Sequence, residues 1–405
     1  MRQVITLSII LIVILATSSF LVSYHATNNT TTKTKPIHLG VSFCGNTTTE
    51  AKLLIDKVKN YTNLLVLQSG PVSKNETAIN EICDYATASG LDIIVYFGWF
   101  DPDYPWQIPW LDTAKQRWNN HFLGVYYYDE PGGIQLDYNW ERLFNRIREW
   151  NVTLYQTYAP ALEGDNSSMS QYYDLSAKMF TDAIKADTGI QELKNRSIPV
   201  YTSDYALYWF DYLGGYDVVF AQFGRNASLV QDIAFARGAS RMQNKPWGAI
   251  ITWTYDMPPY IVDGEEMYDQ MVAAYMAGAD HVVIFNYPQI ENNAYGILTD
   301  EHFEAIEKFW NDITVESDVN NGLSAVRGSS KAEAALVLPR NYGWGMRRPD
   351  DRLWYWGADE KSAQVWEISR KLLSQYGLGL DIVYDDPAFP VAGKYPQVYY
   401  WNESI

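Results

Sequence analysis

Hydrophobic and polar residues follow two periods along most of the chain. Short apolar runs rich in β-branched and aromatic residues recur, and the segments between them place apolar residues every three to four positions, which is the spacing of a helix. The apolar runs cover residues 38–44, 64–69, 91–98, 122–129, 152–157, 198–203, 216–222, 248–254 and 281–287. Alternation of this kind is typical of βα units around a parallel sheet.

The number and spacing of these runs predict the fold. A (β/α)8 barrel needs eight parallel strands within about 250 residues, so we expect a TIM barrel over residues 37–318 rather than a doubly wound sheet with a nucleotide crevice. One run is then surplus, and it is either 152–157 or 216–222. The helix-rich stretch 166–195 predicts an enlarged connection between a strand and the next.

The pattern breaks after a helix predicted over 301–313, at the Gly-, Asn- and Ser-rich segments 320–322 and 328–330, which mark a boundary. The elements predicted beyond it are a strand over 334–338, a helix over 359–376, a strand over 380–384 and a last apolar run over 397–401. Because about 75 residues bury only a small core, we expect residues 331–405 to form a small αβ appendage that leans on the barrel.

Residues 1–25 predict a signal peptide or a membrane anchor helix. Arg2 precedes an apolar stretch from Val4 to Val22, and neither Lys nor Arg follows it before Lys33, an arrangement that leaves the bulk of the chain outside the cell. The length suits an uncleaved anchor about as well as a cleaved signal. Residues 26–36 are rich in Asn and Thr and predict a flexible stalk.

Glycosylation signals and cysteines bear on the same compartment. Sequons of the form Asn-x-Ser/Thr occur at Asn28, Asn29, Asn46, Asn60, Asn75, Asn151, Asn166, Asn195, Asn226 and Asn402. We expect N-linked glycans and an extracellular location, and a surface that is merely rich in Asn and Thr is the alternative. Cys44 and Cys83 can pair outside the cell, although Cys83 lies in a predicted helix, where a buried free thiol is commoner.

Composition and missing motifs exclude several classes of function. Asp and Glu number 48 against 31 Lys and Arg, which gives a net charge of −17 that repels the phosphates of nucleic acids. We therefore predict no nucleic-acid partner. The five histidines show no zinc spacing such as HExxH, so we expect no metal and no organic cofactor. The chain also lacks the motifs GxSxG, GxxxxGK[ST] and GxGxxG of serine esterases, P-loop proteins and dinucleotide-binding proteins.

The carboxyl end of the fourth apolar run carries the sharpest candidate for chemistry. Three tyrosines precede Asp129, Glu130 and Pro131 there, at the barrel end where TIM barrels place their active sites. Desolvation by aromatic neighbours raises the pKa of a carboxyl group, as a general acid near neutral pH requires. Strand alternation sends Asp129 and Glu130 to opposite sides unless the strand bulges. We predict Glu130 as the catalytic acid and Asp129 as an orienting acceptor, and the alternative is that both acids cap the following helix.

Glycoside hydrolysis works through two carboxyl groups, and the second must come from another strand end. Asp256, after the run at 248–254, is the predicted nucleophile or base, and an ordinary loop acid is the alternative for it. Asp204 is the reserve candidate. Gln222 and Asn286 also end predicted strands and are predicted to bind sugar hydroxyls.

Aromatic residues gather in the segments that form the predicted barrel mouth. Flat rings stack on the apolar faces of pyranose rings. The predicted sugar-binding residues are Trp99, Trp106, Trp110, Tyr128, Trp253, Tyr255 and Tyr287. A hydrophobic loop packed against neighbouring helices is the alternative. Because this cleft is expected to be acidic and aromatic without basic residues, we predict a neutral oligosaccharide or polysaccharide as the partner.

With these residues the chain resembles the retaining glycoside hydrolases of clan A. In that clan an Asn-Glu-Pro-like motif ends the fourth strand and supplies the acid/base, and a second Glu ends the seventh strand as nucleophile. The segment Asp129-Glu130-Pro131 matches the first motif with Asp in place of Asn, and Asp256 stands where the clan has Glu. Residues 268–287 and the appendage also resemble the end of the barrel and the amidotransferase-like domain of family 42 β-galactosidases.

The resemblance implies a glycoside hydrolase-like protein of the cell exterior whose contact with the membrane, if any, is through its N-terminal segment. Glu130 then protonates the glycosidic oxygen while Asp256 attacks the anomeric carbon or activates water. The Asp at the seventh strand motivates the alternative of a non-catalytic carbohydrate-binding barrel. A structural cell-surface barrel is the third possibility.

Overall fold

The computed structural model describes residues 37–138, 140–162, 173–224, 228–288, 293–314, 323 and 326–403. The predicted signal or anchor at 1–25 and the stalk at 26–36 lie outside these residues, as do the sequons at Asn28, Asn29, Asn166 and Asn226. Among the helices that the structure describes, none is long and apolar enough to cross a membrane.

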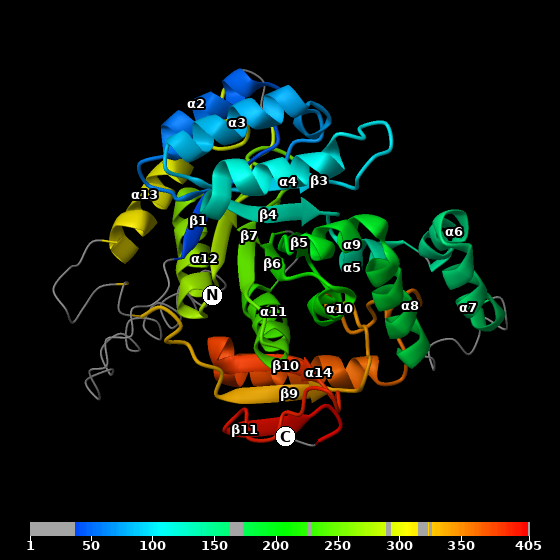
Figure 1. Cartoon of the computed structure of the whole chain (residues 1–405). Coiled ribbons are helices and arrows are strands. Elements are labelled where there is room, and N and C mark those ends of the chain that lie inside the picture. Colours follow the sequence, from blue (N-terminus) through cyan, green and yellow to red (C-terminus); the bar gives the residue numbers. More distant parts are fainter. Residues whose placement is uncertain are drawn as a thin grey trace. The chain divides into compact units, whose positions relative to one another are not determined.

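Eight parallel strands within the described residues close into a barrel in chain order (Figure 1). They are β1 (His38–Phe43), β2 (Leu64–Leu67), β3 (Asp92–Phe97), β4 (Phe122–Tyr127), β5 (Val200–Asp204), β6 (Val218–Phe223), β7 (Trp247–Ile251) and β8 (His281–Ile284). Strand β1 closes the barrel because it pairs with β2 through Gly40 and Leu64 and with β8 through His38 and His281. The predicted TIM barrel is confirmed.

Helices follow the strands as the periodicity predicts. Their bounds are α2 (Thr48–Val58), α3 (Glu76–Ala88), α4 (Gln107–Trp118), α5 (Pro131–Asp137), α6 (Trp140–Trp150), α7 (Val152–Leu162), α8 (Tyr173–Ala186), α9 (Thr188–Asn195), α10 (Tyr208–Gly214), α11 (Leu229–Gln243), α12 (Gly264–Met276) and α13 (Asp300–Thr314). The start of α2 shows how the sequence sets these bounds. Thr47 accepts a hydrogen bond from the Glu50 N–H while the Glu50 carboxylate accepts one from the Thr47 N–H, a capping box.

The surplus apolar run is the one at 152–157, because it lies in helix α7. The other candidate, at 216–222, contains most of β6. The connection from β4 to β5 holds helices α5 to α9 and begins already at Pro131. The enlarged connection therefore exists and starts earlier than the predicted stretch 166–195.

Two hydrophobic cores hold the barrel together. The inner core fills the barrel with side chains from several strands, among them Leu64, Ile94, Tyr126 and Phe220, all fully buried. The outer core lies between the strands and the surrounding helices and continues into the C-terminal region through residues such as Val337 and Ile382. This continuity explains how a short appendage is stabilised: it shares the core of the barrel rather than building one of its own.

The appendage is a three-stranded parallel sheet with one helix. Its strands β9 (Ala334–Leu338), β10 (Leu380–Tyr384) and β11 (Gln397–Tyr400) lie in the order β10-β9-β11, and helix α14 spans Ser362–Tyr376. The bounds of β9 and β10 are those the sequence predicts. The resemblance of this region to an amidotransferase-like domain stays a prediction.

Helix α11 joins the barrel to the appendage, where it lies against β10 (Figure 1). A Cβ atom at Gly238 would lie 2.5 Å from the carbonyl oxygen of Ile382, so only glycine permits this approach. The neighbouring Arg237 donates through Nε to Oδ1 of the fully buried Asp381 at 2.7 Å. It also donates to the carbonyl oxygens of Leu378 and Leu380. The predicted leaning of the appendage on the barrel rests on these contacts.

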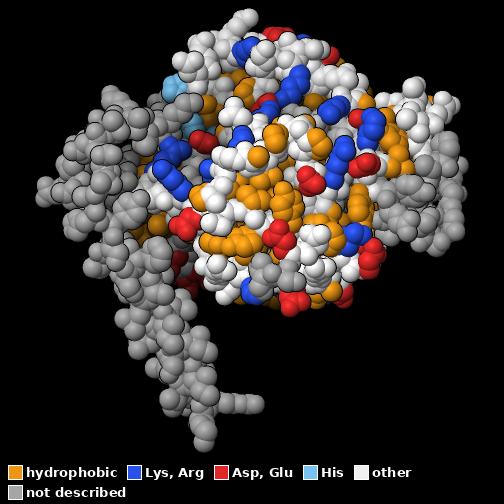
Figure 2. All heavy atoms as spheres, turned by 90° about the horizontal axis from the view of Figure 1, so that it is seen from below, with side chains coloured by type: hydrophobic (Ala, Val, Ile, Leu, Met, Phe, Trp, Pro, Cys, Tyr) orange, Lys and Arg blue, Asp and Glu red, His pale blue; other side chains and the backbone are white. Residues whose placement is uncertain are grey.

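The described surface mixes both signs of charge on one face, and both cysteines are free. Figure 2 shows Lys and Arg side chains interspersed with Asp and Glu around hydrophobic side chains on one face, so the net negative charge forms no continuous acidic patch there. Cys44 and Cys83 are both free thiols. Cys83 is fully buried on α3, so the disulfide that the sequence left open does not form.

Candidate active site

The chain turns sharply where β4 ends. Tyr128 and Glu130 both adopt left-handed backbone conformations, with φ of 56° and 54°, which are uncommon for residues with side chains and are concentrated at functional sites. The turn stays tied to β5 because the Glu130 N–H donates to the Ser203 carbonyl at 3.0 Å. Two left-handed residues end the strand alternation on which the expected orientations of Asp129 and Glu130 depended.

Asp129 belongs to a polar cluster between β4 and β5. Its Oδ1 accepts hydrogen bonds from the Tyr126 hydroxyl and, at 3.1 Å, from Ser203 Oγ. Burial raises the pKa of Asp129, and the two hydroxyl donors oppose that rise. The side chain of Glu130 makes no capping hydrogen bond at the start of α5. The alternative that Asp129 and Glu130 both cap this helix is therefore wrong.

Gln222 connects this cluster to Glu130. Its amide Nε2 donates to Glu130 Oε1 at 2.8 Å and to Ser203 Oγ at 2.9 Å. Burial raises the pKa of Glu130 to about 7, the nearby charge of Asp129 adds to this rise, and the amide of Gln222 opposes it. At neutral pH a large share of Glu130 is therefore protonated, which is the state a general acid needs.

Asp204, at the end of β5, anchors the start of helix α5. Its fully buried carboxyl group accepts from the N–H groups of Gly132 at 2.5 Å and Gly133 at 2.8 Å, and also from those of Tyr205 and Ala206. These donors satisfy N–H groups that a helix N-terminus leaves without partners. Burial nevertheless raises the pKa of Asp204 to about 7. We assign Asp204 to the support of α5 rather than to the reserve catalytic position.

A cavity of about 740 Å³ lies beside Glu130, within the range of about 300–1,000 Å³ that small-molecule sites occupy. Its described lining residues are Glu130, Asp137, Tyr205, Gln222, Gly224, Ser228, Gln231, Asp232, Thr252, Trp253, Gly345, Met346, Arg347, Trp366 and Arg370. The last five belong to the C-terminal region. The appendage therefore supplies one wall of the cavity and the barrel mouth supplies the rest.

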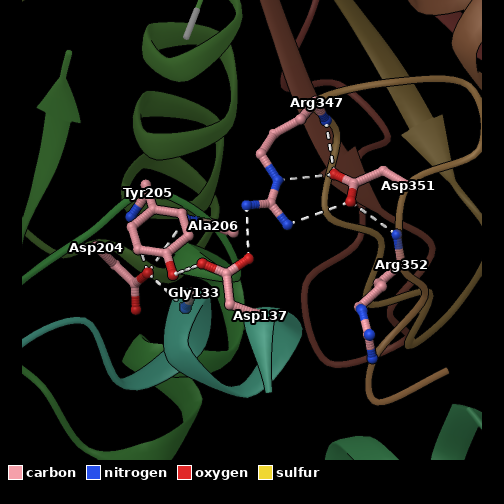
Figure 3. A network of polar contacts seen from close by, with 8 residues as sticks. All are labelled: Gly133, Asp137, Asp204, Tyr205, Ala206, Arg347, Asp351 and Arg352. Carbon is pink, nitrogen blue, oxygen red and sulfur yellow. Dashed lines mark hydrogen bonds and ion pairs between the residues drawn. The ribbon is translucent and has the colours of Figure 1, made fainter. Parts of the chain in front are cut away.

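An ion-pair network fixes the join between these two walls (Figure 3). The guanidinium of Arg347 donates to Asp137 Oδ1 at 2.7 Å and holds Asp351 with two further bonds of 3.0 and 3.2 Å. The hydroxyl of Tyr205 donates to the other oxygen of Asp137 at 2.6 Å. Because Asp137 ends the helix that begins after Glu130, the network ties the C-terminal loop to the catalytic candidate.

Two sequence-predicted site residues lie elsewhere. Asp256 is exposed, in the loop after β7, and is not among the described residues that line the cavity. Its pairing with Glu130 stays a prediction. Asn286 is buried and holds a loop, because its Oδ1 accepts from the Ile297 N–H at 3.1 Å while its own N–H donates to Ser42.

The predicted aromatic platform divides into three groups. Trp253 lines the cavity and packs against Tyr287, with ring centroids 5.5 Å apart. Trp99, Tyr255 and Tyr287 are exposed. The others pack within the protein: Trp106 contacts Phe97, Tyr128 donates to Asp187 at 3.2 Å, and Trp110 lies buried on α4 with its N–H on Asn80. The prediction that Trp110 stacks on a sugar is wrong, since it is a core residue.

Sequence reasoning missed several lining residues. Asp232 on α11 is 5% exposed, and its Oδ2 has no hydrogen-bond partner within the described chain. A single acid on the buried face of a helix was the available signal for it. Arg347 and Arg370 had no local signal, because the appendage brings them in from far along the sequence. Their presence overturns the expectation of a cleft without basic residues.

Nowhere in the described chain do three or more His, Cys, Asp or Glu side chains form a group that could hold a metal ion.

Comparisons with known proteins add context to this geometry. No family model and no curated protein sequence matches the chain. Among solved structures, a family 5 glycoside hydrolase from Streptomyces cattleya in complex with Manβ1-4GlcNAc matches with a TM-score of 0.49 and 12% identity, covering 90% of this chain and 99% of its own. A family 17 β-1,3-glucanosyltransferase from Rhizomucor miehei matches with a TM-score of 0.39 and 13% identity, covering 64% and 92%.

The matches extend beyond sugar enzymes. Orotidine 5'-monophosphate decarboxylase from Methanocaldococcus jannaschii matches with a TM-score of 0.36 and 9% identity, covering 68% of this chain and 97% of its own. These values are too low to carry an argument, and TIM barrels host many unrelated reactions. The fold therefore rests on the strand topology, and function has to be argued from the cavity.

Proposed function

We propose that this chain is a glycoside hydrolase-like enzyme with Glu130 as its proton donor. One observation carries the proposal: a carboxyl group whose pKa is raised to about 7 lines a cavity at the carboxyl end of the barrel strands. In the proposed step, Glu130 gives its proton to the glycosidic oxygen as the bond to the anomeric carbon breaks. The proposed substrate is a glycan. A neutral glycan was expected because the cleft was predicted to lack basic residues, and Arg347 and Arg370 in the lining remove that reason.

The groups around Glu130 suit this role. Gln222 occupies Oε1 as a donor, so the acidic proton resides on Oε2. Asp129 is held away from direct contact by its hydroxyl partners and raises the pKa of Glu130 through its charge. Asp256 is the predicted second carboxylate, acting as nucleophile or as base for water.

A matched pair of variants tests the assignment. Glu130→Gln keeps the shape and removes the proton, while Glu149→Gln makes the same change on an exposed residue of α6. With a panel of oligosaccharides and release of reducing ends as the readout, we expect Glu130→Gln to lower turnover by about 10²–10⁴-fold and Glu149→Gln to leave it unchanged. Undiminished turnover in Glu130→Gln would refute the assignment.

A non-catalytic carbohydrate-binding barrel is the second candidate. It is favoured by the position of Asp256, which is exposed and outside the described cavity lining. Calorimetry combined with the reducing-end assay separates the two functions. Binding of an oligosaccharide without any hydrolysis supports the binding protein, whereas hydrolysis that depends on Glu130 excludes it.

The proposed location is the cell exterior, with the protein secreted or held by its N-terminal segment. The sequons support it: Asn46, Asn60, Asn75, Asn195 and Asn402 are exposed, and Asn151 is partly buried. An oligosaccharyltransferase could therefore reach these side chains on the folded surface. Protein from its native host should lose mass on enzymatic deglycosylation, and an unchanged mass would contradict the glycoprotein proposal.

A further inference from the structure

Arg370 on α14 differs from the other cation of the cavity lining. It is exposed, and its guanidinium lies 5.7 Å from the ring centroid of Trp366, which also lines the cavity. Within the described chain it has no carboxylate partner and no hydrogen bond. Arg347, by contrast, is paired with both Asp137 and Asp351. Arg370 is thus a cation held against a ring at the cavity wall, with its charge uncompensated.

The N-terminus of helix α11 faces the same cavity. Ser228, the N-cap residue, makes no capping hydrogen bond with its side chain, and Ser228, Gln231 and Asp232 all line the cavity. A helix of 15 residues carries a positive partial charge at this end, where anions are stabilised. The N-terminus of α11 and Arg370 therefore both favour a negatively charged ligand.

Asp232 gives independent support for a ligand. Its carboxyl group is buried in the first turn of α11, and Oδ2 lacks a partner among the described residues. Burial raises the pKa of Asp232 well above its ordinary value, which favours its protonated form. A buried polar atom without a partner costs free energy, which a ligand that accepts this proton would recover.

Pairing and burial reduce the negative charge of the lining carboxyl groups. Asp137 is paired at 2.7 Å with Arg347, a cation that it shares with Asp351, and burial favours the protonated forms of Glu130 and Asp232. Arg370 is then the cation of the described lining that has no carboxylate partner among the described residues.

Building on the proposed function, we propose that the cavity binds a glycan that carries an anionic substituent, a carboxylate or a sulfate. Arg370 holds the substituent by a charge-assisted hydrogen bond, and Asp232 and the N-terminus of α11 face the same space. Arg370 is then a specificity-determining residue and takes no part in bond cleavage.

The test uses the full chain and a glycan array of matched pairs. Each uronic-acid oligosaccharide stands beside its methyl ester, and each sulfated oligosaccharide beside its desulfated form, so that the members of a pair differ only at the anionic group. We expect the anionic member of at least one pair to bind about tenfold more tightly. Preference for uronates over their esters assigns a carboxylate, and preference for sulfated members assigns a sulfate.

Variants assign the preference to the residue. Arg370→Gln should abolish it, Arg370→Lys should retain part of it, and Arg148→Gln, at an exposed position of α6, should leave it unchanged. Equal binding of both members of every pair by the unaltered protein, no binding of any anionic member, or an unchanged preference in Arg370→Gln would each overturn the proposal. The variant Glu130→Gln separates this binding proposal from the proposed hydrolysis. A charge preference that Glu130→Gln retains supports the binding proposal, whether or not the unaltered protein hydrolyses the glycan.

Discussion

The amide nitrogen of Gln222 lies 2.8 Å from Oε1 of Glu130 and uses its second hydrogen on Ser203 Oγ at 2.9 Å. A single side chain from the end of β6 thereby fixes the carboxyl group that follows β4 and connects it to Ser203 on β5. Both amide hydrogens are used, so the amide has one orientation. The orientation of Glu130 is consequently set by the barrel and not by the loop that carries it.

Removal of this amide should shift the pH dependence of activity. Gln222→Met keeps the bulk but removes a donor that lowers the pKa of Glu130, so the pKa should rise by about one unit, the equivalent of one hydrogen bond. Activity requires protonated Glu130, and the alkaline limb of kcat/KM should therefore move to higher pH. Gln191→Met, at an exposed position, is the control. An alkaline limb that stays in place or moves to lower pH would contradict the role of Gln222.

The ion-pair network at the join should contribute to stability and to activity. Arg347→Met leaves Asp351, whose side chain is 3% exposed, without its cation, and we expect a loss of about 2 kcal/mol in the free energy of unfolding. Turnover should fall as well, because α5 loses its tie to the appendage. Urea denaturation of Arg347→Met beside Arg348→Met, an exposed neighbour, measures the difference. Equal losses in the two variants would show that the network does not stabilise the join.

The residues of this join show what the sequence could predict and what it could not. The strands at 334–338 and 380–384 were predicted to the residue because continuous apolar runs bounded by polar segments are a local signal. The contact between Arg347 and Asp137 spans 210 positions and has no local signal at all. Arg347 and Arg370 therefore entered the cavity only with the structure, and with them the charge of its wall.

The buried pair of Arg237 and Asp381 provides a second test of the coupling between barrel and appendage. The side chains are 8% and 0% exposed, and removal of one partner from a buried pair costs about 3–5 kcal/mol. We expect Arg237→Met to be destabilised by this amount, and Arg237→Met with Asp381→Leu to recover much of it. A double-mutant cycle by chemical denaturation gives the coupling free energy. A coupling near zero would mean that the pair does not hold the appendage.

Stability should fall in mild acid because of His281. Both ring nitrogens are buried without partners in the described chain, and the ring stacks on His38 at 4.7 Å. Burial lowers the pKa of His281 well below its ordinary value, and the neighbouring His38 and Arg327 add to this effect. Below about pH 6.5, His281 binds a proton in the unfolded chain but not in the folded chain. The free energy of unfolding therefore decreases by up to about 1.4 kcal/mol for each unit by which the pH falls.

The variant His281→Phe isolates this contribution. Phenylalanine keeps a flat ring against His38 but cannot be protonated, so the unfolding free energy should depend less steeply on pH between about 6.5 and 5. Chemical denaturation at a series of pH values measures the slope for both proteins. An identical slope in the variant would assign the acid sensitivity to other groups.

Local conformation explains the remaining differences between expectation and structure. The run at 152–157 is short and apolar, and such a run suits a strand or a buried helix equally; here it is part of α7. Trp110 was predicted to bind sugar at the barrel mouth, yet α4 begins at Gln107 and turns the ring into the core. Glu130, the predicted acid, lines the cavity, but the strand alternation expected for Asp129 and Glu130 is interrupted by the left-handed backbone of Glu130 and Tyr128.

The wall contributed by residues 345–370 also sets an order of events during synthesis. A ribosome makes the chain from the N-terminus, so Glu130, Gln222 and Asp232 have all emerged before Arg347, Trp366 and Arg370 are translated. A nascent barrel without these residues lacks one wall of the cavity beside Glu130. The site is therefore complete only after the last helix has been made and has docked.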